Sequence, residues 1–303
     1  MTDIKYVLQP HLLAPPPEQP ITHDQFGALR SARKVLIAAF DFEESFDLLV
    51  SNYVEMEDAG LSLALGATVR RRLRRYQDMH EMRAELNRRV VNFLSSARLF
   101  IDYLPQRAED CGVDKAIVAA LRSAEYDKHF EYRFMEALRN YVQHRGLAVH
   151  SMGVDSKWLP PGERLYQESH LRVQAVRLYL AADGNFNARV LRECPERVDI
   201  LEASRHYLES LASVQSQIRQ LIKDSVAAAR QMTKGAIESY VASTNGASPL
   251  GLEAKVLDGE DQIESVPVFL DWDDVRLELE RRNDGFTNLR LRRVTSGPSI
   301  FRT

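Results

Sequence analysis

Apolar residues recur every three or four positions along most of the chain, the spacing that places them on one face of an α-helix. The pattern runs through residues 22–59 and is interrupted near residues 39–41, so we expect two helices there. A long amphipathic helix is predicted over residues 73–106, ended by Pro105 and Gly112. Further helices are predicted over residues 114–123, 126–145 and 195–241.

Three segments depart from this helical pattern. Five prolines in residues 1–21 predict an extended arm, because proline fixes φ and donates no backbone hydrogen bond. Residues 147–185 contain a Pro-Pro-Gly turn and the alternating stretch HLRVQAVRLYL, which indicate a small β/loop insertion. Residues 243–303 have a weak apolar pattern, with edge strands expected only in VPVFLDW and TNLRLRRV. The predicted fold is mainly α, a helical bundle over residues 22–242 followed by a weakly structured C-terminal appendage.

The net charge of −3 conceals stretches of opposite sign. Ten arginines and four acids make residues 70–107 basic, whereas eleven acids and four bases make residues 252–284 acidic, before an acid-free basic end. A local basic surface can attract RNA whatever the total charge of the protein. The acidic stretch is either a docking tail for a partner or an intramolecular mask over the arginines.

Several functional classes have no support in the sequence. Cys111 and Cys194 lie far apart without a CxxC or Cys/His spacing, so neither a disulfide framework nor a zinc site is indicated. The histidines show no metal-binding spacing, and the common phosphate-loop, dinucleotide, serine-hydrolase and zinc-protease motifs are absent. No stretch reaches the roughly 20 apolar residues of a membrane span. We therefore expect a cytoplasmic protein without a metal or cofactor.

The run RRRLRR at residues 70–75 places five arginines in roughly one and a half helical turns. These residues, Arg70, Arg71, Arg72, Arg74 and Arg75, are candidates for guiding RNA phosphates. A solvated helix start, partly neutralised by nearby acids, explains the same pattern equally well.

The stretch RNYVQHRG, residues 139–146, carries the candidate chemistry. His144 lies at the edge of an apolar helical seam, on the same flank as Asn140 and Arg133. Arg139 points about 140° away from His144, so these two side chains cannot close on one small group within a straight helix. Gly146 follows at the position of a left-handed cap. From these angles alone, Arg139 is a solvated residue and His144 a favourable cation at the helix end.

The residue types also resemble the signature of the HEPN superfamily of helical nucleotide-binding and ribonuclease domains: an arginine, a polar residue, three to five further residues and a histidine. Arg139, Asn140 and His144 match those positions, and the phrase EYRFMEALRNYVQHRG is similar to that of bacterial proteins assigned to this group. The resemblance covers residues 30–240 as a helical layout. It implies a homodimer whose motif helices surround one cleft, so that arginine and histidine from two copies can cooperate.

By this resemblance the activity is metal-independent cleavage of RNA, in stress or phage defence. His144 would transfer protons at the ribose 2′-OH or the leaving oxygen, Arg139 would hold the phosphate, and Asn140 would orient either group. Arg133 and Tyr141 are further candidates for substrate binding. Two alternatives stay open: a catalytically inactive HEPN-like scaffold that binds nucleotides or a regulatory protein partner, and a structural oligomer in which Arg139 forms an interface ion pair.

Overall fold

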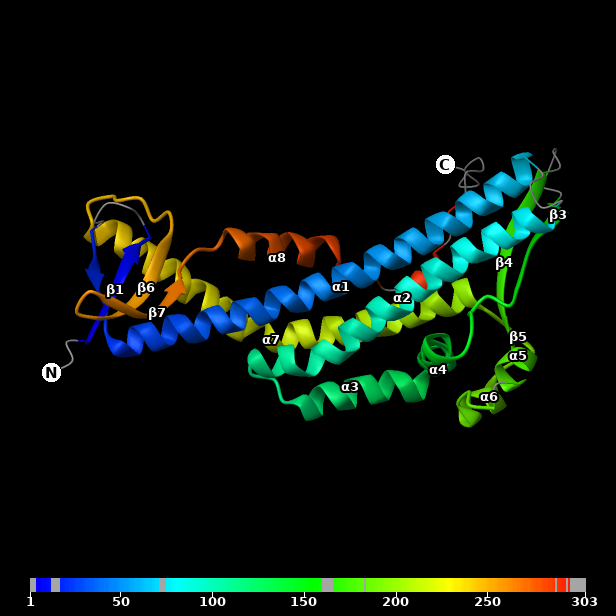
Figure 1. The fold of residues 1–303 in the computed structure, drawn as a ribbon, viewed down its shortest axis with the longest axis horizontal. Coiled ribbons are helices and arrows are strands. Elements are labelled where there is room, and N and C mark those ends of the chain that lie inside the picture. Colours follow the sequence, from blue (N-terminus) through cyan, green and yellow to red (C-terminus); the bar gives the residue numbers. More distant parts are fainter. Residues whose placement is uncertain are drawn as a thin grey trace, which may run out of the picture. The chain divides into compact units, whose positions relative to one another are not determined.

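The chain folds into a mainly helical structure with two small antiparallel sheets, seen in a computed structural model (Figure 1). The structure describes residues 4–11, 17–70, 75–159, 166–182, 184–286, 288–292 and 294. By their mutual contacts the residues form two compact units. Unit 1 comprises Met1–Asp47, Leu99–Ala120 and Ser216–Asp284, and unit 2 comprises Leu48–Arg98, Leu121–Gln215 and Gly285–Thr303.

Several helices supply residues to both units. They are α1 (His23–Arg70), α2 (Tyr76–Asp110), α3 (Lys115–Lys128) and α7 (Ile200–Ser243). The other helices are α4 (Phe130–His144), α5 (Arg177–Ala182), α6 (Ala188–Glu193), α8 (Asp271–Arg282) and the 3-10 helix η1 (Leu289–Leu291). Over the described ranges, no helix has a stretch long and apolar enough to cross a membrane.

The predicted helices are present, but two of their predicted boundaries are wrong. α1 is continuous through residues 39–41, where the pattern predicts a break. Ala38, Ala39 and Phe42 are all buried there and none of them disrupts a helix, so core packing continues across this point. α2 continues past Pro105 to Asp110, and the chain turns only at Gly112, whose φ of 91° favours glycine.

Unit 1 contains a four-stranded antiparallel sheet in the order β2-β1-β6-β7. Its strands are β1 (Ile4–Pro10), β2 (Gln19–Pro20), β6 (Leu252–Asp258) and β7 (Asp261–Pro267). β1 and β6 pair along their whole length, from Ile4 opposite Asp258 to Pro10 opposite Leu252. The extended N-terminal arm therefore includes a hydrogen-bonded strand.

The C-terminal appendage is more ordered than its sequence pattern predicts, because β6, β7 and α8 all belong to unit 1. The weak local pattern is misleading here, since β6 is stabilised by a strand from the other end of the chain. The two predicted edge strands are also misplaced. β7 ends at Pro267 near the start of VPVFLDW, and η1 occupies Leu289–Leu291 within TNLRLRRV.

The sheet of unit 1 packs against the beginning of α1 and the end of α7 (Figure 1). Alternating strand residues point into this core, where they meet side chains of the two helices. Full burial stabilises each large apolar side chain by roughly 1.5–3 kcal/mol. The buried residues are Leu8, Phe26, Leu29, Tyr240, Leu252, Ala254, Val256, Val266 and Val268.

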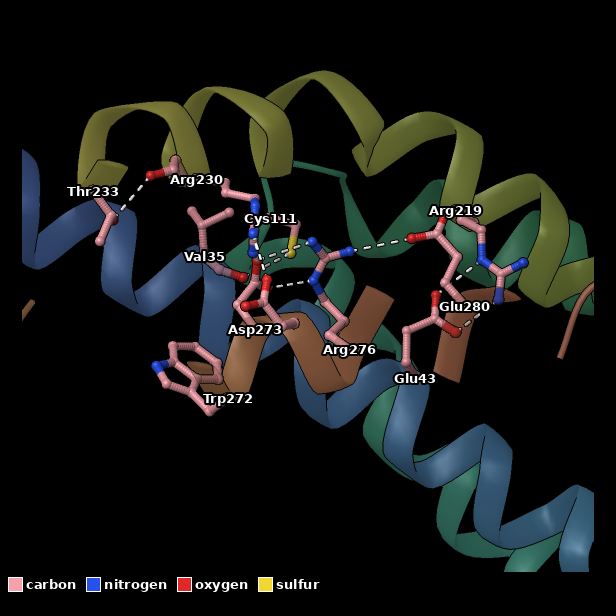
Figure 2. A network of polar contacts seen from close by, with 12 residues as sticks. Val35, Glu43, Cys111, Arg219, Arg230, Thr233, Trp272, Asp273, Arg276 and Glu280 are labelled. Atoms are coloured by element: carbon pink, nitrogen blue, oxygen red, sulfur yellow. Dashed lines mark hydrogen bonds and ion pairs between the residues drawn. The ribbon is translucent and has the colours of Figure 1, made fainter. Parts of the chain in front are cut away.

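α8 docks within unit 1 largely through charged side chains (Figure 2). Its buried residues are Asp273, Arg276 and Leu279, so only one of them is apolar. Asp273 is fully buried and accepts hydrogen bonds from Arg276 of the same helix, at 2.5 Å from Nε, and from Arg230 of α7. Arg230 also donates to the exposed Asp274 at 2.5 Å. The negative charge of the buried Asp273 carboxylate is thus compensated by two guanidinium groups.

A second buried ion pair joins α1 to α7 in the same unit (Figure 2). Arg219 donates two hydrogen bonds to Glu43, of 2.9 and 2.7 Å, in the parallel geometry that suits a guanidinium and a carboxylate. Burial raises the pKa of Glu43, although the hydrogen bonds and the charge of Arg219 act in the opposite direction. Removing either partner would leave the other charge desolvated and unpaired.

The substitution Asp273→Asn should lower the free energy of unfolding by about 3 kcal/mol, because it leaves two guanidinium groups facing a neutral amide in the protein interior. Asp274→Asn removes a bond from the same Arg230 at an exposed position and should cost less than about 1 kcal/mol. Denaturant unfolding of the full chain, with hydrogen exchange of α8 amides, measures both effects. Equal losses in the two variants would contradict this account of how α8 docks.

Unit 2 contains a second sheet in the order β3-β4-β5. β3 (Ser151–Leu159) and β4 (Tyr166–Val176) form an antiparallel hairpin, and β4 also pairs with β5 (Arg197–Asp199). The small insertion predicted in residues 147–185 corresponds to this hairpin, although α5 begins at Arg177, where the alternating stretch still predicts strand. The Pro-Pro-Gly turn at residues 160–162 lies outside the described residues.

A row of aromatic rings forms the centre of unit 2. Tyr53 of α1 contacts Phe93 of α2, with ring centroids 5.9 Å apart, and Phe93 contacts Tyr207 of α7 at 6.1 Å. Tyr207 meets Tyr132 of α4 at 5.1 Å in an edge-to-face arrangement. These contacts fix α4, which carries the RNYVQH motif, against α7.

Candidate functional site

α4 is buried over one broad face that extends beyond the predicted apolar seam. Phe134 is fully buried on one flank. On the other flank Tyr132 packs against Tyr207, whose hydroxyl donates a hydrogen bond to Glu136. Tyr132, Glu136 and Arg139 are spaced at i, i+4 and i+7 and therefore share this second flank. A helical projection that counts only apolar residues underestimates this flank, because Glu136 contacts Tyr207 through a hydrogen bond.

Arg139 is half-buried, which corrects the expectation of a solvated residue. Its Nη1 donates a hydrogen bond of 2.8 Å to Oδ1 of the exposed Asn140. Its Nε is buried and has no hydrogen-bond partner among the described residues. The guanidinium is therefore directed toward Asn140, and one of its donors is desolvated without compensation.

His144 is the last residue of α4, and its side chain is exposed. Within the described part of the chain, no hydrogen bond or ion pair is made by its imidazole. An exposed imidazole of this kind is free to exchange protons with a ligand.

Asn140 contacts Arg139 and lies on the same helical flank as His144. Arg139 and His144 are separated by about 140° around the regular helix. Asn140 lies one turn before His144 on the same flank and receives the Arg139 guanidinium at 2.8 Å. The structure thus brings Arg139 together with Asn140, whereas no contact between Arg139 and His144 occurs in the described residues.

Arg133 has structural partners for its donors. Nη1 donates to the carbonyl oxygens of Tyr126 and Asp127 near the end of α3, at 2.7 and 2.9 Å. Nη2 and Nε bind Glu193 of α6 at 2.6 and 3.2 Å, and this bond lowers the pKa of Glu193. Arg133 therefore links α3, α4 and α6, and a substrate would have to displace these bonds.

Tyr141 contacts His150 and not the motif histidine. The Tyr141 hydroxyl lies 3.5 Å from Nε2 of His150, while the Val176 amide donates to Nδ1 at 3.0 Å. Since Nδ1 accepts a hydrogen bond, the neutral ring carries its proton on Nε2. Burial, with a contribution from the charge of Arg83, lowers the pKa of His150 below its ordinary value of 6.5. Tyr141 thus supports the base of the hairpin.

Gly146 is required for space and not for a left-handed cap. It is not among the described glycines with positive φ, so the predicted cap geometry is wrong. A Cβ atom at this position would lie 2.7 Å from the Tyr141 hydroxyl oxygen, closer than van der Waals contact allows. The ring of Tyr141 therefore occupies the place of a side chain at residue 146.

The lowered pKa of His150 predicts a loss of stability in mild acid. As the pH falls below 6.5, the unfolded chain takes up a proton before the folded chain does, so stability is complete above that pH and decreases below it. Unfolding measured at about pH 7.5 and about pH 5.5 should show a smaller difference in His150→Gln than in the wild type. His144→Gln, at an exposed histidine, is the control and should retain the wild-type difference. An unchanged difference in His150→Gln would refute the assignment.

The basic run at residues 70–75 is described only in part. Arg71, Arg72 and Arg74 lie outside the described residues, and Arg70 is the last residue of α1. Arg75 is exposed. The role predicted for these arginines in guiding RNA stays a prediction.

A polar cluster beside the motif has no counterpart in the sequence analysis. Burial raises the pKa of Tyr132 to about 12 and that of Tyr207 well above its ordinary value, and the charge of Glu136 acts in the same direction. Both tyrosines therefore stay neutral at physiological pH. Tyr207 serves as a hydrogen-bond donor that fixes Glu136 and the flank of α4 that carries Arg139. The i, i+4 spacing of Tyr132 and Glu136 is the sequence signal that could have indicated this cluster.

The described residues contain no group of three or more His, Cys, Asp or Glu side chains that could hold a metal ion. No family model matches the chain, and comparisons with curated proteins and with solved structures give no significant match.

Proposed function

We propose that this protein is a metal-independent endoribonuclease of HEPN type that acts as a homodimer. The observation that carries the proposal is the arrangement of the three motif residues. Arg139 directs its guanidinium to Asn140, and His144, one turn further on the flank of Asn140, has an exposed imidazole without a partner in the described residues. A phosphate binder and a proton-transfer group are thus adjacent to one polar residue.

The proposed reaction is an internal transfer at phosphorus. The ribose 2′-oxygen attacks the adjacent phosphorus while its proton passes to a neutral imidazole, and the bond to the 5′-oxygen breaks as that oxygen receives a proton. The products carry a 2′,3′-cyclic phosphate and a 5′-OH. Arg139 would stabilise the charge on the phosphate oxygens. A cleft shared by two copies would supply two histidines, one to accept and one to donate a proton.

A catalytically inactive HEPN-like scaffold is the second candidate function. It is favoured by the half-burial of Arg139 and by the hydrogen bonds that already use the donors of the Arg133 guanidinium. In such a protein the motif arginine would have a structural role in α4, and the exposed residues would bind a nucleotide or a protein partner.

RNA cleavage in the presence of EDTA distinguishes the two functions. The wild type should produce cyclic phosphate ends, and His144→Ala should lose at least about a hundredfold in rate, the usual effect of removing an acid-base group. Arg139→Lys keeps the charge but loses the planar fork, so it should also be slow. Gln143→Ala, at an exposed residue of the same helical turn, is the matched control and should cleave normally.

Co-expression of the Arg139→Ala and His144→Ala chains tests the shared cleft. If one cleft uses arginine from one copy and histidine from the other, mixed dimers regain part of the activity that each variant has lost. Absence of rescue, with differently tagged variant chains co-purifying as mixed dimers, would place the reacting groups within one copy. Folded wild-type protein that cleaves no RNA would favour the scaffold.

A further inference from the structure

A basic cavity of about 330 Å³ lies within unit 1, far along the sequence from the RNYVQH motif. One face of α1 supplies Arg30, Arg33 and Lys34, which are spaced at i, i+3 and i+4. The end of α2 supplies Arg107 and Asp110. Four cationic side chains and one carboxylate therefore line the same space.

Three of the four cations pair with carboxylates at or near the rim. Lys34 lies 3.0 Å from Asp110, and Arg107 lies 2.6 Å from Asp41. Arg30 contacts Glu264 at 3.3 Å, with both side chains exposed. An exposed pair such as Arg30 with Glu264 contributes little stability, and Arg30 can readily exchange Glu264 for another anion. The side chains of Arg30 and Lys34 are 61% and 69% exposed, so they are free to reorient toward a ligand.

Arg33 differs from the other three cations because no described carboxylate pairs with it. Its Nη1 donates to the carbonyl oxygen of Pro267 at 3.1 Å, and its guanidinium lies 5.6 Å from the ring centroids of both Phe269 and Trp272. Burial lowers the pKa of Arg33, which means that its positive charge is incompletely compensated. An anion beside Arg33 would supply the missing compensation.

We propose that this cavity binds a phosphorylated small molecule of mononucleotide size. Arg33 and Lys34 would contact the phosphate, whose oxygens match several cationic donors at once. Ile37 and Val266 also line the cavity and give the remainder of the ligand an apolar surface. A volume of about 330 Å³ lies at the small end of the roughly 300–1,000 Å³ of ligand sites.

Asp110 limits which anion can bind. Its carboxylate is held by Lys34 and by Nε2 of Gln106 at 3.1 Å, and these bonds lower its pKa although burial acts in the opposite direction. Asp110 therefore stays ionised and repels anions on its side of the cavity. The phosphate is expected on the side of Arg33, with Lys34 moving from Asp110 toward the ligand.

Calorimetric titration of the full chain with AMP, inorganic phosphate and adenosine tests this site. AMP should bind, inorganic phosphate should bind more weakly, and the uncharged adenosine should give no signal. Lys34→Gln and Arg33→Gln should each weaken AMP binding about tenfold, as expected for the loss of one charge-assisted bond. Lys34→Gln alters an exposed residue and keeps the test decisive if Arg33→Gln fails to fold. Lys234→Gln, at an exposed lysine of α7 outside the cavity, is the control and should bind normally.

The alternative source of phosphate is RNA, and a short single-stranded RNA forms a further arm of the titration. RNA binding that weakens in both cavity variants, without any binding of AMP or phosphate, would overturn the proposal of a small ligand. AMP binding of equal strength in wild type, Lys34→Gln and Arg33→Gln would also overturn it. The site does not depend on the proposed nuclease, because His144→Ala should bind AMP as the wild type does.

Discussion

The antiparallel pairing of β1 with β6 is the interaction on which the architecture of unit 1 depends. It joins Ile4–Pro10 to Leu252–Asp258, and β6 in turn holds β7 on its other side. Leu8 and Leu252 enter the core through this ladder, while residues 265–267 of β7 form one wall of the basic cavity. Without β1, the edge of β6 would lose its backbone partners and part of the core would face water. The core and the cavity of unit 1 therefore both depend on the pairing of β1 with β6.

Charge-based docking gives α8 a defined register. An apolar helix face can slide by a turn and still bury a comparable area, whereas a shift of α8 would separate the buried Asp273 from Arg230 of α7. The acidic stretch that contains α8 is therefore partly neutralised within unit 1, by Arg230 at Asp273 and Asp274 and by Arg30 at Glu264. Masking of the RRRLRR run by the same acids stays a hypothesis, since most of that run lies outside the described residues.

Local signals predicted most of the helices and the hairpin, because helical and strand periodicity reflect contacts that each element makes along one face. The same signals could not predict the strand pairing between Ile4–Pro10 and Leu252–Asp258, whose partners lie at opposite ends of the chain. Local signals also missed part of the buried face of α4. There Tyr132 packs against Tyr207, and Glu136 accepts a hydrogen bond from the Tyr207 hydroxyl. The sequence predicts a left-handed cap at Gly146, whereas the structure explains this glycine by its close approach to the Tyr141 hydroxyl, a contact that turn rules do not predict.

If α4 carries the proposed nuclease site, its packing limits how Arg139 can reach a ligand, which the match of residue types alone does not show. Tyr132 and Glu136 share the flank of Arg139, whose guanidinium is already directed to Asn140. A phosphate bound there would lie beside the flank of His144, since Asn140 and His144 are one helical turn apart. The polar residue of the motif would then act as a positioning residue that turns the arginine toward the histidine. In the proposed nuclease, a second copy would supply the other proton-transfer group and exclude water from the cleft.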